Sequence, residues 1–187
     1  MPRAPPRAAT VRRRPPDDAT LPPTALARPD AMTFRHQTPQ ALDDEHRAAL
    51  ALYGKLEQAV AAGDDDALAR LAGALARHLD VEIGHHFEIE EREIFPRLAE
   101  SGEGDIAALL EEEHGAIREV VAELGPLVPP GARATAPARD AFRRLALELV
   151  ERQVAHIQKE SMALLPVLDD MLDDETDRAL SFALASA

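Results

Sequence analysis

Four histidines occupy positions where the helical spacing of the chain calls for an apolar side chain. They are His46, His86, His114 and His156. In "HFEIE", Glu90 follows four residues after His86, and in "HIQKE", Glu160 follows His156 at the same spacing. Because side chains at i and i+4 lie one above the other on a helix, each pair presents an imidazole and a carboxylate on one face. Such a pair is suited to provide two neighbouring ligands of a metal ion.

These six side chains predict a centre of two first-row metal ions with bridging carboxylates. Burying two ionised carboxylates would cost several kcal/mol each unless cations compensate them. The chain has no cysteine, so histidine and carboxylate must provide the ligands. Two octahedral ions offer twelve coordination positions, of which four imidazoles, two bridging carboxylates and a bridging oxo or hydroxo group fill ten. Two positions remain open, enough for a small molecule.

A second histidine–glutamate pair competes with the one in "HFEIE". In "HLDVE", Glu82 follows His78 by four residues. Counted from the turn between the second and third segments, Glu90 and His114 lie at the same level, which favours the pair in "HFEIE". Counted from the first turn, His46 lies opposite the rival pair. The flanking sequence favours the pair in "HFEIE", and His78 or Glu82 stays an alternative.

Other side chains near these positions are predicted to lie outside the site. Surface positions are expected for Glu88, Glu91, Glu93, Glu111, Glu112, His36 and His85. Tyr53 lies two helical turns after His46, and plain core packing is expected for it. The alternative for Tyr53 is that it donates a hydrogen bond or an electron near the site.

Four long helices and a short fifth one must position the candidate ligands. Apolar residues at three- and four-residue spacing predict helices over 38–63, 65–99, 105–124 and 138–165, and after Asp174. Thr38 is the expected N-cap of the first helix, with Pro39 at its first position. Pro96 is expected to bend or end the second helix. No strand pattern is present, so the chain is predicted to be all-α, an antiparallel up-down four-helix bundle.

The N-terminal part of the sequence differs from the rest. Residues 1–37 contain eight of the fifteen prolines and show no apolar period, so a disordered tail is predicted, with the bundle over 38–187. The alternatives are a basic arm that contacts acidic partners and a true start at Met32. Residues 1–39 carry a net charge of +4 and residues 40–187 one of -17, out of -13 for the whole chain.

Composition also bounds the partners. The acidic charge of the helical part repels phosphate and argues against nucleic-acid binding. No apolar run approaches the roughly 20 residues of a membrane span, and the N-terminus lacks the apolar core of a secretory signal. A cytoplasmic monomer without membrane contact is therefore expected.

Several of these motifs resemble the hemerythrin-like, His-His-Glu cation-binding domains. "HFEIEEREIFP" is similar to the second-helix signature of that family, and "DDEHRAAL", "EEEHGAI" and "HIQKESMALLPVL" are similar to its first, third and fourth helices. The resemblance covers about residues 38–170. It implies a non-haem di-iron centre, oxo- or hydroxo-bridged, inside a four-helix bundle. The ligands it implies are His46, His86, Glu90, His114, His156 and Glu160.

One position departs from the oxygen carriers of this family. Those proteins have a further histidine four residues after the third-helix one, and Arg118 stands there in this chain. Their centre has one open position, whereas two are expected here unless Glu82 or a water fills one. The implied ligand is a small diatomic molecule, oxygen or nitric oxide, which the protein would bind or sense, or the site would respond to iron supply.

Other functions remain in competition with this one. A di-iron oxidase or peroxidase is the enzyme alternative, although those bundles favour Glu-x-x-His and more carboxylates. A metal-free bundle would have to satisfy the histidine–glutamate layer by mutual hydrogen bonds. A zinc hydrolase is disfavoured because no His-Glu-x-x-His motif is present.

Overall fold

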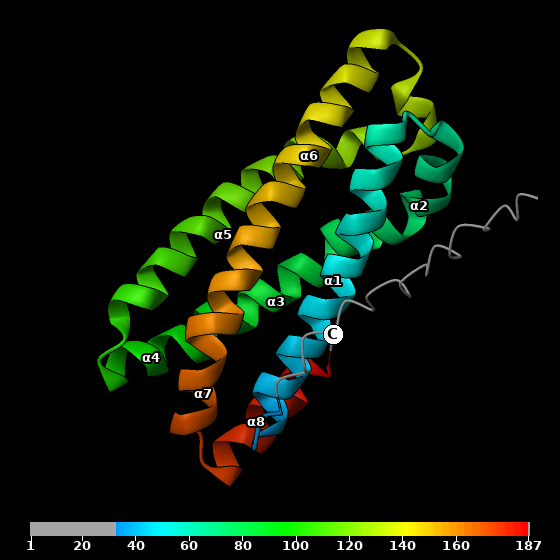
Figure 1. Ribbon diagram of the computed structural model, residues 1–187. Coiled ribbons are helices and arrows are strands. Elements are labelled where there is room, and N and C mark those ends of the chain that lie inside the picture. The colour runs from blue at the N-terminus through cyan, green and yellow to red at the C-terminus, as the bar shows by residue number, and fades with distance from the viewer. Residues whose placement is uncertain (1–32, 187) are drawn as a thin grey trace, which may run out of the picture. The chain divides into compact units, whose positions relative to one another are not determined.

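The computed structural model of the chain describes residues 33–186, and all regular elements in this range are helical (Figure 1). Most of the predicted tail, residues 1–32, lies outside the described part. Within that part, no helix is both long enough and apolar enough to cross a membrane. The side chain of Glu82 is also outside the description.

Five helical segments follow one another along the chain. The first is α1, Gln37–Ala62. The second is a continuous run of α2 (Asp65–Arg77), α3 (Ile83–Ile89) and α4 (Phe95–Ser101), joined by π-helical turns at His78–Glu82 and Glu90–Ile94. The third is α5, Gly104–Leu124, followed by 3-10 turns at Gly125–Leu127 and Pro130–Arg133. The fourth joins α6 (Ala136–Lys159) to α7 (Leu165–Met171) through a π-helical turn at Glu160–Leu164. The fifth is α8, Asp174–Leu184.

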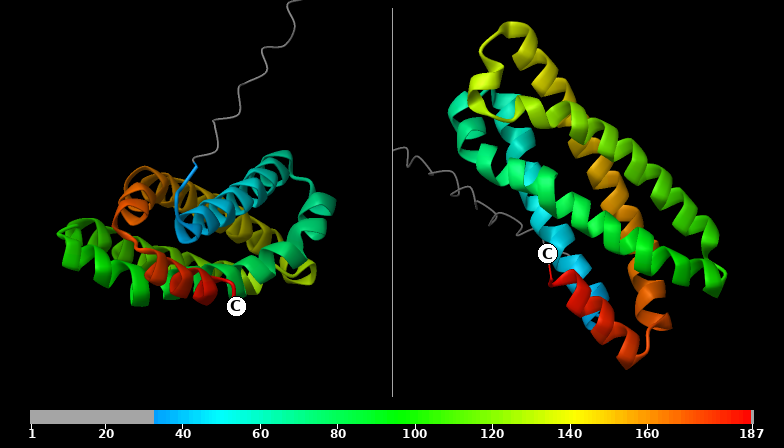
Figure 2. Two further views of the ribbon diagram at one scale, coloured as in Figure 1. Left: turned by 90° about the horizontal axis from the view of Figure 1, so that it is seen from below. Right: turned by 180° about the vertical axis from the view of Figure 1, so that it is seen from behind.

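The long segments pack side by side around a common interior. Helix α5 contacts α4 and α6, and α1 contacts α2, α6, α7 and α8. Figure 2 shows α1 beside the run of α6 and α7, with the run from α2 to α4 and α5 on the opposite side. Side chains from different segments therefore face one another across the interior.

The start of α1 differs from the prediction. Thr38 lies inside the helix, and the N-cap residue is His36, whose side chain makes no cap hydrogen bond. Instead, the backbone N–H groups of Gln37 and Thr38 donate to the Asp177 carboxylate of α8 at 2.9 and 2.8 Å. The carboxylate of Asp169, at the end of α7, accepts from the N–H of His36 at 3.0 Å. The cap thus comes from a segment far along the chain.

The helix continues through Pro96, which does not end it. Pro96 and Pro166 each follow six residues after a glutamate, Glu90 and Glu160, that opens a π-helical turn. A proline cannot donate to the carbonyl four residues earlier, and its ring clashes with that carbonyl. In the wider π turn the N–H of the residue before each proline donates to the glutamate carbonyl instead. The chain can therefore keep a helical course at both prolines.

Two apolar clusters lie on either side of a buried polar layer. One contains Tyr53, Leu149 and other side chains from the α2 end of the interior. The other contains Leu42, Leu98 and Leu168. His46 lies between Leu42 and Tyr53 on α1, so its level separates the two clusters. Burial of these clusters holds the helical segments in place around the polar layer.

Candidate metal centre

The structure brings all six predicted ligands into one buried layer. Each of them is at most 9 % exposed. His46 comes from α1, His86 from α3, His114 from α5 and His156 from α6. Glu90 and Glu160 are the first residues of two π-helical turns. π-Helical turns often occur at functional sites, and their position at these two carboxylates is typical of such a site. The role of the six residues as ligands remains a prediction.

The six side chains form two groups that share both carboxylates. Ligand atoms of His46, His86, Glu90 and Glu160 lie within 4.8 Å of one another. The same holds for the group of Glu90, His114, His156 and Glu160. The two groups therefore differ in their histidines and have the glutamates in common.

Each shared carboxylate directs one oxygen toward each histidine pair. Oε1 of Glu90 lies 3.3 Å from Nε2 of His86, and its Oε2 lies 3.3 Å from Nε2 of His114. Oε2 of Glu160 lies 3.0 Å from Nε2 of His46, and its Oε1 lies 3.0 Å from Nε2 of His156. This is the arrangement required of carboxylates that bridge two ions.

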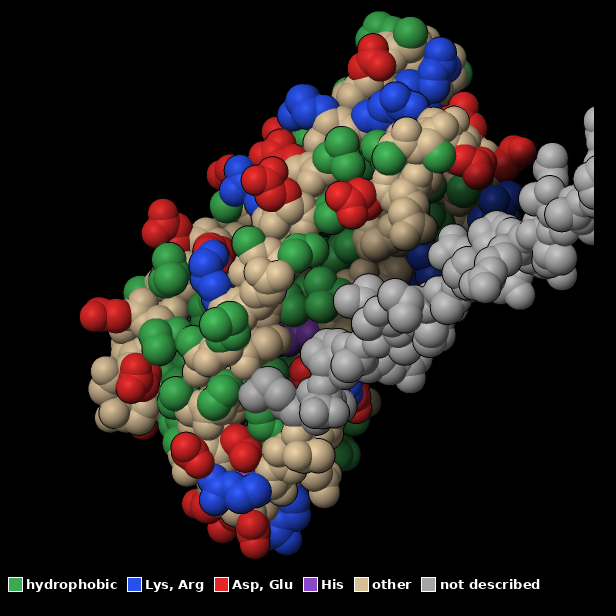
Figure 3. Space-filling model, viewed as in Figure 1, with side chains coloured by type: hydrophobic (Ala, Val, Ile, Leu, Met, Phe, Trp, Pro, Cys, Tyr) green, Lys and Arg blue, Asp and Glu red, His purple; other side chains and the backbone are tan. Residues whose placement is uncertain are grey.

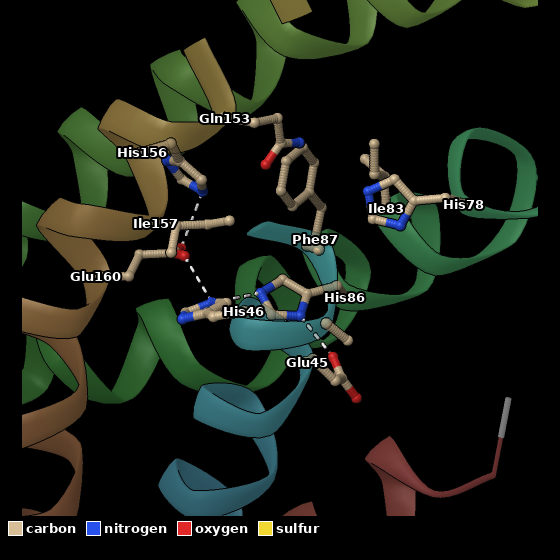
Figure 4. A pocket seen from close by; sticks show the side chains of 12 residues that line it. Glu45, His46, His78, Ile83, His86, Phe87, Gln153, His156, Ile157 and Glu160 are labelled. Atoms are coloured by element: carbon tan, nitrogen blue, oxygen red, sulfur yellow. Dashed lines mark hydrogen bonds and ion pairs between the residues drawn. The ribbon is translucent and has the colours of Figure 1, made fainter. Parts of the chain in front are cut away.

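The Nε2 atoms face one another in pairs. His46 and His86 approach to 3.3 Å, and His114 and His156 to 3.1 Å (Figure 4 shows the first pair). The Nδ1–H of His114 donates to Glu91 at 2.8 Å, and that of His156 donates to Glu113 at 3.0 Å. In the neutral tautomer both Nε2 atoms then carry lone pairs directed at each other. Such a pair needs a cation or a shared proton between the two nitrogens.

The carboxylate oxygens of Glu90 and Glu160 also fit a cation. All four are buried, and each lies 3.0 or 3.3 Å from the Nε2 atom of one of the four histidines. Two buried, ionised carboxylates are strongly destabilising unless cations or protonated groups compensate their charge. The donor set of four imidazoles and two carboxylates is typical of first-row metals such as iron, manganese and zinc. These residues therefore fit a pair of metal ions.

Without a cation, protons take the place of metal. Burial lowers the pKa of His114, but its contacts with Glu160 and Glu90 outweigh this effect and raise the pKa to about 9. Burial likewise opposes the charging of His86, yet Glu90 and Glu45 raise its pKa well above the usual value. Burial raises the pKa of Glu160, whereas contacts with three imidazoles hold it well below the usual value. Metal ions would therefore bind in competition with protons on the histidines.

Three carboxylates outside the layer orient three of the imidazoles. Glu45 accepts from Nδ1 of His86 at 2.7 Å, and Glu91 and Glu113 accept from His114 and His156 as described above. Such outer carboxylates fix the tautomer and the ring orientation of metal-bound histidines. The Nδ1 atom of His46 has no partner among the described residues.

Sequence reasoning missed this outer set. Glu91 was expected to be solvated, but it accepts from His114 and from Arg118 at 2.6 Å. Glu113 similarly binds Lys159. The only available signal was position in the sequence, because each of these glutamates is next to a predicted ligand. The histidine that it orients, however, lies on a different helix. Arg118 lies outside the layer because it pairs with Glu91.

The rival histidine lies elsewhere. His78 is buried, but neither group of possible metal ligands contains it. Its Nε2 lies 2.6 Å from the hydroxyl of Tyr53. Tyr53 packs in the core, as expected, and has this polar partner in addition. The prediction that Glu82 fills a coordination position concerns a side chain outside the described part of the chain.

A cavity of about 230 Å³ adjoins the layer. Its lining includes His46, His86, His156 and Glu160 together with His78, Gln153 and several apolar side chains (Figure 4). In the space-filling view, a histidine is visible between α1 and α6, next to hydrophobic side chains (Figure 3). A small molecule could therefore reach one side of the layer.

Comparison with known protein families agrees with this site. The family model described as the Hemerythrin HHE cation binding domain matches residues 38–168, which include all six candidate ligands. The match confirms the resemblance inferred from the sequence. No curated protein matches the chain.

Proposed function

The chain belongs to the hemerythrin HHE cation-binding family, and on that premise we propose that it binds two iron ions between its helices. The proposed ligands are His46, His86, Glu90, His114, His156 and Glu160. In this proposal the long helices act as an antiparallel four-helix bundle with the ions in its interior. The bound ions would leave open coordination for oxygen or another small diatomic ligand.

One observation carries this proposal. Glu90 and Glu160 belong to both groups of possible ligands, and each directs one oxygen to each histidine pair. Two separate mononuclear sites would not need shared carboxylates, and a layer held only by hydrogen bonds would not require each carboxylate to face both histidine pairs. Two adjacent cations satisfy both features.

The coordination count supports an open site. Each group provides two imidazoles and two carboxylate oxygens, which is fewer than the six positions of an octahedral ion. Arg118 stands where the oxygen carriers have a further histidine, and it pairs with Glu91 instead of adding a ligand. When bound, iron would supply the redox-active ion to which the diatomic ligand attaches. The chain would orient the imidazoles and exclude bulk water.

Metal loading tests the proposal. The protein is loaded with ferrous iron without air, iron is counted per chain, and oxygen is admitted while the visible spectrum is recorded. We expect about two irons per chain and the charge-transfer bands of coupled ferric ions. The His114→Ala variant should bind less iron. His85→Ala is the matched control, because the His85 ring contacts Leu184 outside the layer.

Two results would contradict the proposal. One is iron at background level with a melting temperature unchanged by metal. The other is a single iron per chain that both His46→Ala and His114→Ala leave in place.

A further inference from the structure

The cavity beside the layer is larger than a diatomic ligand requires. Its volume of about 230 Å³ compares with about 30 Å³ per water molecule in the liquid. A molecule of two heavy atoms would leave most of this space unfilled. Apolar side chains form much of the wall, among them Ile83, Phe87 and Ile157. The cavity therefore suits a ligand with an apolar body of several atoms.

Gln153 places a buried amide in the wall of this cavity. Its side chain is only 3 % exposed, and its Nε2 has no hydrogen-bond partner among the described residues. Gln153 precedes His156 by three residues on α6, so its amide lies about one turn from a candidate ligand. Figure 4 shows this amide between His156 and the ring of Phe87. A buried donor without a partner is costly unless a ligand or water accepts from it.

His78 closes the cavity away from the candidate ligands. It lies beside Ile83 in Figure 4, on the far side of Phe87 from His156. Its contact with the Tyr53 hydroxyl fixes the imidazole in place. The π-helical turn that begins at His78 has no candidate ligand at its start, unlike the other two. His78 is therefore in contact both with the cavity and with Tyr53, the single tyrosine of the chain.

We propose that this cavity binds a small monocarboxylate whose second oxygen accepts a hydrogen bond from Gln153. This inference rests on the proposed function, because one carboxylate oxygen would bind the metal centre. A carboxylate has a second acceptor for the donor of Gln153, and a short alkyl group would fill the apolar part of the cavity. Without the positive ions, Glu45 and Glu160 in the cavity wall would repel an anion.

Calorimetric titration of the iron-loaded protein with a series of monocarboxylates tests this idea. Formate, acetate, propionate and butyrate differ only in the length of the apolar group, and azide serves as a small anion without one. We expect the dissociation constant to fall about fourfold for each added methylene until the cavity is full. Octanoate should bind more weakly than butyrate because it exceeds the space.

Two variants identify the residues that bind the ligand. Gln153→Leu keeps the size of the side chain and removes the donor, so it should weaken every carboxylate about tenfold or more. Gln158→Leu on the exposed face of the same helix should leave the affinities unchanged. Ala49→Leu narrows the cavity and should weaken butyrate more than formate.

Tyrosine fluorescence gives an independent signal. The chain has one tyrosine and no tryptophan, so the emission comes from Tyr53 alone. In zinc-loaded protein, which lacks the near-ultraviolet absorption of ferric iron, binding should change this emission through the contact of Tyr53 with His78. The change should be half complete at the dissociation constant that calorimetry gives for the same zinc-loaded protein, and Gln153→Leu should shift it to higher ligand concentration.

Three outcomes would overturn the proposal. If metal does not bind, this inference and the proposed function both fail. If metal binds fully but longer carboxylates bind no better than formate, only this inference fails. If azide and the carboxylates bind equally well to Gln153→Leu and to the unchanged protein, the ligand contacts the ions alone.

Discussion

Removal of the Glu113 carboxylate should weaken one of the two metal positions and spare the other. Oε2 of Glu113 accepts from Nδ1 of His156 at 3.0 Å, and Lys159 pairs with its other oxygen. Burial raises the pKa of Glu113, but Lys159 and His156 outweigh this and lower it, so the carboxylate is charged at neutral pH. Only the group with His114 and His156 depends on this contact.

The expected size of the effect follows from the role of such carboxylates. Loss of an outer hydrogen bond to a metal-bound histidine costs about 10- to 100-fold in metal affinity. In Glu113→Ala, a competitive titration with a chelator should therefore show one ion bound as before and one bound 10- to 100-fold more weakly. Glu113→Gln keeps a hydrogen-bond acceptor but loses the charge. Its affinity for the second ion should lie between those of the unchanged protein and Glu113→Ala.

Glu112→Ala is the matched control. Glu112 is the preceding residue on α5 and is exposed. It should retain two ions with unchanged affinities. Equal weakening of both ions in Glu113→Ala, or weakening of neither, would refute the assignment of this carboxylate to one position.

Two further predictions concern stability. The pKa of His114 is raised in the fold to about 9. Protonated His114 therefore contributes fully to the free energy of unfolding below about pH 6.5, and this contribution is lost as the pH rises through 9. Denaturant unfolding of the metal-free protein should show about 3 kcal/mol less stability above that window, and an unchanged stability there would contradict the prediction. Asp177→Ala removes the acceptor for the N–H groups of Gln37 and Thr38 and should cost about 1–2 kcal/mol. Glu175→Ala, on the exposed face of α8, should change the free energy of unfolding by less than about 0.5 kcal/mol, and equal effects of the two variants would refute the cap.

Local signals in the sequence predicted the candidate ligands. A histidine on an apolar stripe, with a glutamate four residues later, is visible without any knowledge of packing. The C-terminal end of α1 at Gly63 was also predictable, because this residue has φ 65° and few other residues adopt that conformation. The Asp64 cap of α2 follows the same local rule.

Counting residues from the first turn, as if the helices were straight, predicted the wrong neighbour for His46. It placed His78 and Glu82 opposite this residue, whereas the structure places His86 there. The count assumed a regular rise of about 1.5 Å per residue. The π-helical turn at His78–Glu82 adds a residue to its turn, and the course of the run changes between α2 and α3 (Figure 1). Neither effect has a signature in the apolar pattern.

Long-range contacts account for most of what the sequence did not predict. The outer carboxylates act on histidines of other helices, so their role depends on tertiary structure. The cap of α1 comes from Asp177, which lies 139 residues after Thr38. The shared spacing from Glu90 to Pro96 and from Glu160 to Pro166 was visible in the sequence, but a six-residue interval alone does not predict a π-helical turn.

The contacts of α8 with the start of α1 have a kinetic consequence. The helix that contains His46 is held at its N-terminus by Asp177 and Asp169, and α8 also packs along it. Movement of α1 that withdraws His46 from the layer would break those hydrogen bonds. Local opening of the last helix would then limit the rate at which His46 can leave the layer. The amide protons of Gln37 and Thr38 would exchange with deuterium only through this opening.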